Sequence, residues 1–126
     1  MKILLVDDSK TLRNIQKNTL KSLGYADVAE AATVAEALAS IANGRPDLML
    51  VDWNMTKIDG ISLIREVREK DQALPIIMVT THAEKSRVME AVKAGVTNFV
   101  VKPFTAEVLA EKINQTMAKF APVATA

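Results

Sequence analysis

The amino-acid sequence predicts an α/β fold, a doubly wound five-stranded parallel sheet with five helices on its two faces. Short apolar runs of strand length alternate five times with segments whose apolar residues recur at helical spacing. Most runs are uninterrupted, which is typical of strands buried on both faces. The connections are short, so we expect right-handed crossovers. The 126 residues leave room for one domain with its own core.

The first strand is expected at residues 2–6, where four apolar side chains run into two acidic ones. Ser9 can cap the helix that follows, and Gly24 stands where helices commonly end with a glycine. Along this helix the residues at the spacing of a core-facing stripe are Leu12, Ile15, Thr19, Leu20 and Leu23.

A weaker strand spans residues 27–31. Thr33 and Glu36 then fit a capping box, with Thr33 as N-cap and Glu36 reaching back toward it. The helix that they open should end near residues 43–44. The side chains that it should direct inward are Ala37, Leu38 and Ile41.

The central strand is expected at residues 48–51, an apolar run that ends in the acidic residue Asp52. A parallel sheet delivers whatever ends such a strand to its carboxyl edge, where ligands of open α/β sheets bind. Folding therefore places the charge of Asp52 at a reactive edge. We single out Asp52 as the principal candidate functional residue.

Residues 59–60 open a third helix, and a fourth buried strand follows at residues 76–80. A fourth helix is expected from about residue 84 to Gly95. The apolar positions of the third helix are Ile61, Ile64 and Val67, and those of the fourth are Val88, Met89 and Val92.

The fifth strand is expected at residues 98–101, and Thr105 can cap the last helix. The apolar positions of that helix are Leu109, Ile113, Met117 and Phe120. We expect one folded domain over residues 1–120 and a disordered C-terminal tail over residues 121–126, which has no pattern. Doubly wound sheets of this kind commonly have the flavodoxin-like strand order 2-1-3-4-5.

The composition argues against several classes of protein. Lys and Arg number 16 against 15 Asp and Glu, so nothing indicates a nucleic-acid partner. The chain has no Cys, which excludes disulfides and thiolate zinc sites. No apolar run is long enough to span a membrane, and residues 1–4 lead directly into a strand pattern instead of a signal peptide. We expect a cytoplasmic monomer.

Polar residues gather at the ends of four of the five strands. They are Asp7, Asp8, Asp52, Thr80 and Lys102. Two unit charges about 4 Å apart repel by about 4 kcal/mol at an effective dielectric of about 20, so three clustered carboxylates need a counter-charge beyond one lysine. Oxygen ligands without Cys or His favour Mg²⁺ over zinc. Since Mg²⁺ often joins carboxylates to phosphate oxygens, this edge predicts phosphoryl chemistry.

Each of these residues also has a structural interpretation. A single Asp or Thr after a strand is more often a cap or turn residue, and a single Lys is usually on the surface. Five such residues at four strand ends are hard to explain as caps. The joint arrangement therefore favours a functional site.

Four motifs carry a resemblance to a known family: Val6-Asp7-Asp8-Ser9, Val51-Asp52-Trp53-Asn54-Met55, Val79-Thr80 and Val101-Lys102-Pro103-Phe104-Thr105. In this order and spacing they resemble the receiver domain of two-component response regulators. The resemblance covers essentially the whole chain. Among receivers the chain is most similar to the stand-alone regulators of chemotaxis.

The resemblance implies that Asp52 accepts a phosphoryl group from a phosphohistidine on a sensor histidine kinase. It implies that Mg²⁺ is held by Asp8, Asp52 and the backbone carbonyl of Asn54, with Asp7 acting through a bound water. Such a protein is a signalling switch rather than an enzyme, and catalyses only its own phosphoryl transfer and autodephosphorylation.

The same resemblance implies that Lys102 pairs with a phosphoryl oxygen and that the Lys102-Pro103 peptide is cis. Thr80 would donate its hydroxyl to another phosphoryl oxygen and, by moving, let Phe99 swing inward. The partner-binding surface would contain Lys85, Val88, Phe99 and Lys112, and its partner would be a flagellar motor switch protein. Core packing of Val88 and Phe99 and solvated faces for both lysines are the structural alternatives.

Some residues depart from the family pattern or tune it. Thr56 stands where the family usually has proline, which predicts a more mobile loop, and Thr81 is bulkier than the usual residue. Asn54 and His82 match positions that tune the lifetime of the phosphoryl group. Substitution of His82 is therefore expected to change the autodephosphorylation rate several-fold, although an exposed loop position without a role is the alternative.

Other functions compete with this one. A haloacid-dehalogenase-like phosphatase also uses an aspartyl nucleophile and Mg²⁺, but it requires Asp-x-Asp after its first strand, whereas Asp7 and Asp8 are adjacent. A receiver-like interaction module that is never phosphorylated is a further alternative. A phosphate sink or phosphorelay intermediate would share the same site as a motor regulator.

Overall fold

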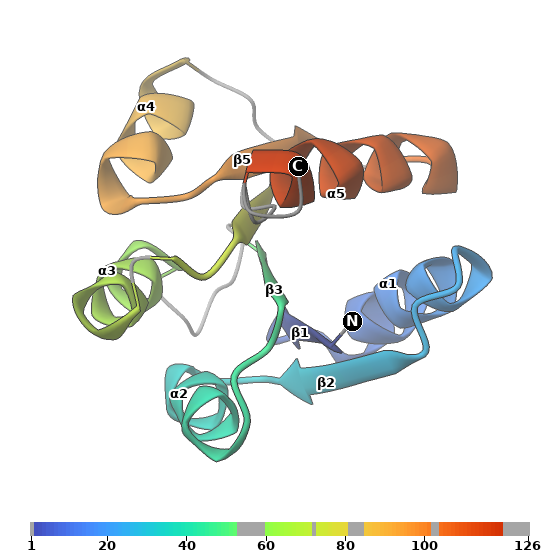
Figure 1. Cartoon of the computed structure of the whole chain (residues 1–126), viewed down its shortest axis with the longest axis horizontal. Coiled ribbons are helices and arrows are strands. Elements are labelled where there is room, and N and C mark those ends of the chain that lie inside the picture. The colour runs from blue at the N-terminus through green and yellow to red at the C-terminus, as the bar shows by residue number, and fades with distance from the viewer. Residues whose placement is uncertain (1, 53–59, 72, 81–84, 102–103, 120–126) are drawn as a thin grey trace.

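The fold is a five-stranded parallel sheet with helices on both faces (Figure 1). The computed structural model describes residues 2–52, 60–71, 73–80, 85–101 and 104–119. The strands run in the order β2-β1-β3-β4-β5, which confirms the predicted topology. Strands and helices alternate along the chain as β1 (Lys2–Val6), α1 (Lys10–Ser22), β2 (Asp27–Ala31), α2 (Val34–Asn43), β3 (Leu48–Asp52), α3 (Gly60–Lys70), β4 (Ile76–Thr80), α4 (Lys85–Ala94), β5 (Asn98–Val101) and α5 (Ala106–Lys119).

Successive residues of the central strands point to opposite faces of the sheet and enter two separate cores. Leu4, Met49 and Val51 pack in the core that α2, α3 and α4 cover, together with Ile64 and Val67 of α3. On the opposite face, the core covered by α1 and α5 consists chiefly of Ile3, Leu5, Leu20, Leu48, Leu50, Ile77, Leu109 and Ile113. Figure 1 shows α1 and α5 on one side of the sheet and α2, α3 and α4 on the other. Burial on both faces explains why these strands read as uninterrupted apolar runs.

The helix starts are capped as the sequence predicts, with one difference. The hydroxyls of Ser9, Thr33 and Thr105 each accept a hydrogen bond from a backbone N–H three residues later, at 3.3, 3.1 and 3.2 Å. The Glu36 carboxylate accepts from the N–H of Ala32 at 3.0 Å, one residue before the N-cap that a capping box would use. Each cap satisfies an N–H that has no partner within its own helix.

Two helices face the core differently from the prediction. On α1, Leu12 and Ile15 are exposed, Ile15 to 56%, while Gln16 and Leu20 are buried. On α4, Met89 and Val92 are exposed, and Ala91 and Ala94 are buried. The residues that face the core are thus Gln16 and Leu20 on α1 and the small Ala91 and Ala94 on α4, instead of the larger apolar side chains. The inward prediction for Leu12, Ile15, Met89 and Val92 is therefore wrong.

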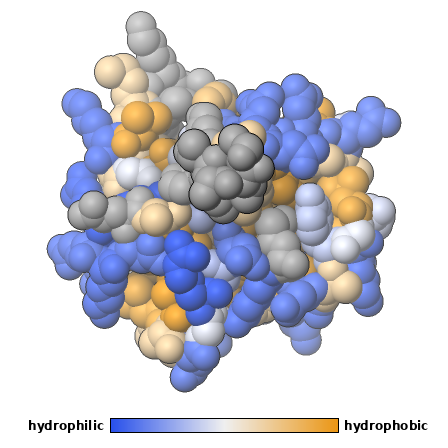
Figure 2. All heavy atoms as spheres, viewed as in Figure 1, coloured by the Kyte–Doolittle hydropathy of each residue, from blue (hydrophilic) through white to orange (hydrophobic). Residues whose placement is uncertain are grey.

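The surface combines a polar covering with small apolar groups. Figure 2 shows hydrophilic residues over most of one face, with apolar residues gathered in separate places between them. The large apolar side chains that are exposed among the described residues are Leu12, Ile15, Met89, Val92, Val101 and Val108. Within the described ranges, no helix combines the length and apolar character needed to cross a membrane.

Arginine side chains tie together the loops at the amino edge of the sheet, opposite the strand ends that carry the acidic residues. Arg45 forms an ion pair with Asp71, which also accepts the N–H groups of Ala73 and Leu74, each at 3.0 Å. The hydrogen bond from Arg45 lowers the pKa of the Asp71 carboxyl, and the same bond raises the pKa of Arg45. Burial lowers the pKa of Arg68, because the charged guanidinium loses solvent.

The lowered pKa of Asp71 predicts a pH-dependent contribution to stability. Its folded pKa lies below the unfolded value of about 3.9, so the contribution is complete above that pH and is lost as the pH falls through the folded pKa. Arg45 is about half exposed, so we expect Asp71→Asn to lower the free energy of unfolding by only about 1 kcal/mol at neutral pH. Urea denaturation at several pH values should show this difference shrinking below about pH 4. A difference that stays constant with pH would contradict the prediction.

Gly95 is expected to tolerate substitution less well than Gly24. Both have a positive φ, 114° and 94°, which costs an alanine about 1–2 kcal/mol. A Cβ on Gly24 meets nothing, whereas one on Gly95 would lie 2.8 Å from Cγ of Arg68. Arg68 cannot move freely, because its Nε donates to the Gly95 carbonyl at 2.8 Å and its Nη1 to the Asp71 carbonyl at 3.0 Å. Chemical denaturation should show Gly95→Ala to be destabilised by about 1–3 kcal/mol more than Gly24→Ala. Equal losses of stability in the two variants would mean that the positive φ alone, and not the contact with Arg68, determines the cost of the substitution.

Candidate functional site

The carboxyl edge of the sheet gathers four of the five polar residues that the sequence places at strand ends. β1 and β3 are neighbours, with Val6 opposite Val51, so the acidic residues after β1 lie beside Asp52 at the end of β3. Asp7 and Asp52 are only 1% and 3% exposed, and Asp8 is half-buried. Thr80, fully buried, ends the next strand, since Asp52 pairs with Val79. Two buried carboxylates and a buried hydroxyl therefore end three adjacent strands.

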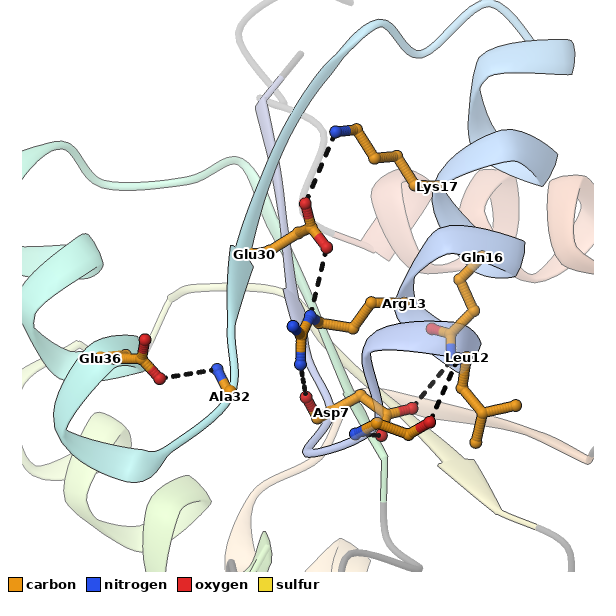
Figure 3. A network of polar contacts seen from close by, with 9 residues as sticks. Asp7, Leu12, Arg13, Gln16, Lys17, Glu30, Ala32 and Glu36 are labelled. Carbon is orange, nitrogen blue, oxygen red and sulfur yellow. Dashed lines mark hydrogen bonds and ion pairs between the residues drawn. The ribbon is translucent and has the colours of Figure 1, made fainter.

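Asp7 is held at both its main chain and its side chain (Figure 3). Its N–H donates to the carbonyl of Ala31 on β2 at 3.1 Å. Its Oδ1 accepts the N–H of Ser9 at 2.9 Å, and its Oδ2 accepts from Nε2 of Gln16 at 3.3 Å. Nη1 of Arg13 donates to the Asp7 carbonyl at 2.6 Å. These bonds fix the orientation of a carboxylate that folding has removed from water.

Arg13 and Gln16 are the residues near the site that sequence reasoning missed. They lie three residues apart on α1 and therefore share one face of the helix. Nε of Arg13 also pairs with Glu30 on β2 at 3.2 Å, and Nζ of Lys17 pairs with the other oxygen of Glu30 at 3.5 Å. Their helical spacing from Leu20 could have indicated that they face the sheet. The apolar residues in line with Ile15 instead favoured a different face of the helix as the buried one.

The donor chemistry of this edge fits a hard dication. Asp7, Asp8 and Asp52 supply carboxylate oxygens, and the chain contains no Cys and a single His. Within the part of the chain that the structure describes, no group of three or more His, Cys, Asp or Glu residues forms a ready metal-binding cluster. Mg²⁺ commonly uses one or two carboxylates, retains several waters and does without an all-protein cage. An open carboxylate site suits Mg²⁺ better than zinc.

Comparison with known proteins decides the family. The sequence model of the protein family described as response regulator receiver domain matches residues 3–114 of the chain. The chain belongs to this family. Receiver proteins similar to it include the chemotaxis protein CheY1 of Helicobacter pylori, 48% identical over 116 residues that cover 90% of this chain and 94% of the relative. The chemotaxis protein CheY of Pseudomonas aeruginosa is also 48% identical, over 91% of this chain and 94% of its own length.

Solved structures support the same assignment. The chemotaxis protein CheY4 of Vibrio cholerae superposes with a TM-score of 0.85 at 34% identity, covering 91% of this chain and 97% of that chain. A CheY-like receiver domain protein of Methanospirillum hungatei gives a TM-score of 0.84 at 30% identity. The predicted family and fold are thus confirmed, and the chain is a receiver domain similar to proteins named as CheY chemotaxis proteins.

In this receiver, Phe99 and Lys112 lie together on the face formed by β5 and α5. Nζ of Lys112 lies 5.3 Å from the centroid of the Phe99 ring, within the range of a cation–π contact. Phe99 is half-buried and borders a cavity of about 160 Å³ between α4 and β5, which Met78 and Ala91 also line. The aromatic side chain therefore has open space beside it.

The remaining predicted residues of the receiver site lie outside what the structure describes. Lys85 and Val88 belong to α4, but only their backbone is described. Among the residues named from the sequence, those outside the described ranges are Trp53, Asn54, Met55, Thr56, Thr81, His82, Lys102, Pro103, Phe120 and the tail 121–126. The roles that the sequence predicts for them stay predictions.

Proposed function

We propose that this protein is a single-domain response regulator in which Asp52 is phosphorylated by a sensor histidine kinase in a Mg²⁺-dependent reaction. The receiver domain would span residues 1–120 and act as a monomer. The observation that carries the proposal is the position of Asp52, a buried carboxylate at the carboxyl end of the central strand. Asp7 directly follows one neighbouring strand, β1, and Thr80 ends the other, β4.

The proposed reaction is an in-line displacement at phosphorus. An oxygen of Asp52 forms a bond to phosphorus while the bond from phosphorus to the imidazole nitrogen of the donor breaks and its electron pair stays on that nitrogen. The other ring nitrogen carries a proton taken from solvent, so the products are an acyl phosphate and a neutral imidazole. The Thr80 hydroxyl would donate to one phosphoryl oxygen and Lys102 would pair with another. These groups position and stabilise charge, which is most of what phosphoryl transfer requires.

Asp8, Asp52 and the backbone carbonyl of Asn54 would hold Mg²⁺, with Asp7 acting through a water. When bound, the ion supplies positive charge between the carboxylates and the incoming phosphoryl oxygens. The hydrogen bonds that already occupy Oδ1 and Oδ2 of Asp7 support an indirect role for this residue. The rigid support beneath the site comes from β1 and β3, which are buried from Ile3 to Val6 and from Leu48 to Val51.

Phosphorylation would be read out at the face that contains Phe99. Thr80 and Val101 are opposite each other on β4 and β5, so movement of Thr80 can be transmitted to the neighbouring strand. The cavity beside Phe99 gives its ring space for a second position. Phe99, Lys112, Lys85 and Val88 would form the surface that binds the downstream partner, with Asn54 and His82 setting the phosphoryl lifetime.

The proposed partners are a CheA-like kinase and a flagellar motor switch protein, since the similar curated proteins are named as chemotaxis proteins. Capture of a motor switch protein by the phosphorylated form, but not by the unphosphorylated form, would support motor regulation. Exchange of the phosphoryl group with a histidine phosphotransfer protein, without capture of a switch protein, would instead support a phosphate sink or relay intermediate.

The proposed function is tested by incubation with acetyl phosphate, followed by intact mass measurement. We expect a single phosphate adduct in the presence of Mg²⁺ and none when EDTA removes the metal. An adduct that forms equally well with EDTA would contradict the role of Mg²⁺. Absence of an adduct, despite metal binding, would favour the interaction module that is never phosphorylated.

A further inference from the structure

The side chain of Gln16 is buried on the sheet-facing side of α1. It is only 5% exposed and lies four residues before the fully buried Leu20, on the same face of the helix. Burial of an amide costs free energy unless its polar atoms are hydrogen-bonded. A glutamine at such a position therefore needs a specific partner.

The hydrogen-bond partner of Gln16 is the carboxylate of Asp7 in the acidic site. Its Nε2 donates to Oδ2 of Asp7 at 3.3 Å, while the Ser9 N–H occupies Oδ1 at 2.9 Å. Figure 3 shows Gln16 reaching from α1 to Asp7, with Arg13 bonded to the main chain of the same residue. α1 thus controls the orientation of the Asp7 carboxylate.

The neutrality of Gln16 matters for a site that must attract a cation. A lysine or arginine at this position would offset the negative charge of Asp7 directly. Arg13 and Lys17, two cationic side chains of α1, instead pair their charges with Glu30 on β2. Gln16 supplies a hydrogen bond to Asp7 without adding charge.

We propose that Gln16 is a positioning residue for the magnesium site, which orients the Asp7 carboxylate toward a metal-bound water and leaves its negative charge intact. This inference rests on the proposed function, in which Asp8 and Asp52 contact the ion directly. Partners that orient metal ligands commonly affect metal affinity by about 10–100-fold. Gln16 acts through Asp7, so we expect the lower end of this range.

The test is the dissociation constant for Mg²⁺, measured by isothermal titration calorimetry on the folded protein. Gln16→Met keeps the length of the side chain and removes the donor, and is expected to weaken Mg²⁺ binding about tenfold. The matched control is Gln115→Met on α5, because exposed Gln115 also donates to a carboxylate, Oε1 of Glu111, at 3.3 Å. This control should bind Mg²⁺ as the wild type does.

A second variant tests the importance of neutrality. Gln16→Lys keeps a donor but adds a positive charge, so it should bind Mg²⁺ more weakly than Gln16→Met. Wild-type affinity in Gln16→Met would overturn the positioning role, and wild-type affinity in Gln16→Lys would overturn the requirement for a neutral donor. A purely structural role would lower the melting temperature and leave the affinity of folded molecules unchanged.

A measurement on the wild type covers the case in which the variants fail to fold. The side-chain amide resonances of Gln16 should shift during a Mg²⁺ titration by NMR, while those of Gln115 should not. Unshifted Gln16 resonances at saturating Mg²⁺ would overturn this inference but leave the proposed function standing. A wild-type protein that binds no Mg²⁺ would overturn the proposed function and this inference with it.

Discussion

Substitution of Asp52 by Asn is expected to abolish the phosphate adduct that the wild type forms with acetyl phosphate and Mg²⁺. The side-chain amide has no full negative charge on oxygen and cannot form an acyl phosphate, so the nucleophile is lost. Asn has nearly the same size and shape as Asp, and the buried position at the end of β3 should still be filled. Intact mass measured over time should show unmodified protein only.

Asp27→Asn is the matched control. Asp27 is an exposed Asp at the start of β2. In the sheet register it lies opposite Lys2 of β1, at the amino edge of the sheet and away from the site. This variant should form the adduct at the wild-type rate. An adduct that persists in Asp52→Asn would show that another carboxylate, such as Asp8, accepts the phosphoryl group, and would refute the assignment of Asp52. Circular dichroism of both variants should confirm that they are folded.

The central strands were predictable because burial on both faces leaves a simple signature, and the strand order followed from the topology that is common in doubly wound sheets. Ile76 to Val79 and Leu48 to Val51 are apolar without interruption, and each run is fully buried. The direction of the chain in such a sheet then decides where the next residue lies. This is why Asp7, Asp52 and Thr80 could be placed at one edge without knowledge of any contact between them.

The rotation of the helices was harder to predict, because an exposed apolar residue is common on protein surfaces. Ile15 and Gln16 are adjacent, and apolar character alone favours Ile15 for the core. The hydrogen bond from Gln16 to Asp7 exists only once α1 has packed against β1, so neither residue reveals it locally. The hydrogen bonds of Arg13 and Gln16 to Asp7 depend on this rotation of α1, so the sequence pattern did not reveal them either.

Leu20→Ala and Ile15→Ala, two truncations on the same helix, are expected to have very different effects on stability. Leu20 is fully buried in the core between the sheet, α1 and α5, whose members include Leu5 and Ile113. Its truncation removes buried apolar surface and leaves a cavity, which should lower the free energy of unfolding by about 2–5 kcal/mol. Urea denaturation at neutral pH measures the loss.

Ile15→Ala should change the free energy of unfolding by less than about 0.5 kcal/mol, because Ile15 is exposed and alanine has the higher helix propensity. The sequence pattern alone ranks both positions as core, so this pair distinguishes the observed rotation of α1 from the predicted one. Comparable losses in the two variants would mean that Ile15 is covered in solution and that α1 packs on the stripe the sequence suggested. A large loss in Leu20→Ala alone would also support the orientation that brings Gln16 to Asp7, since both residues lie on the same face of the helix.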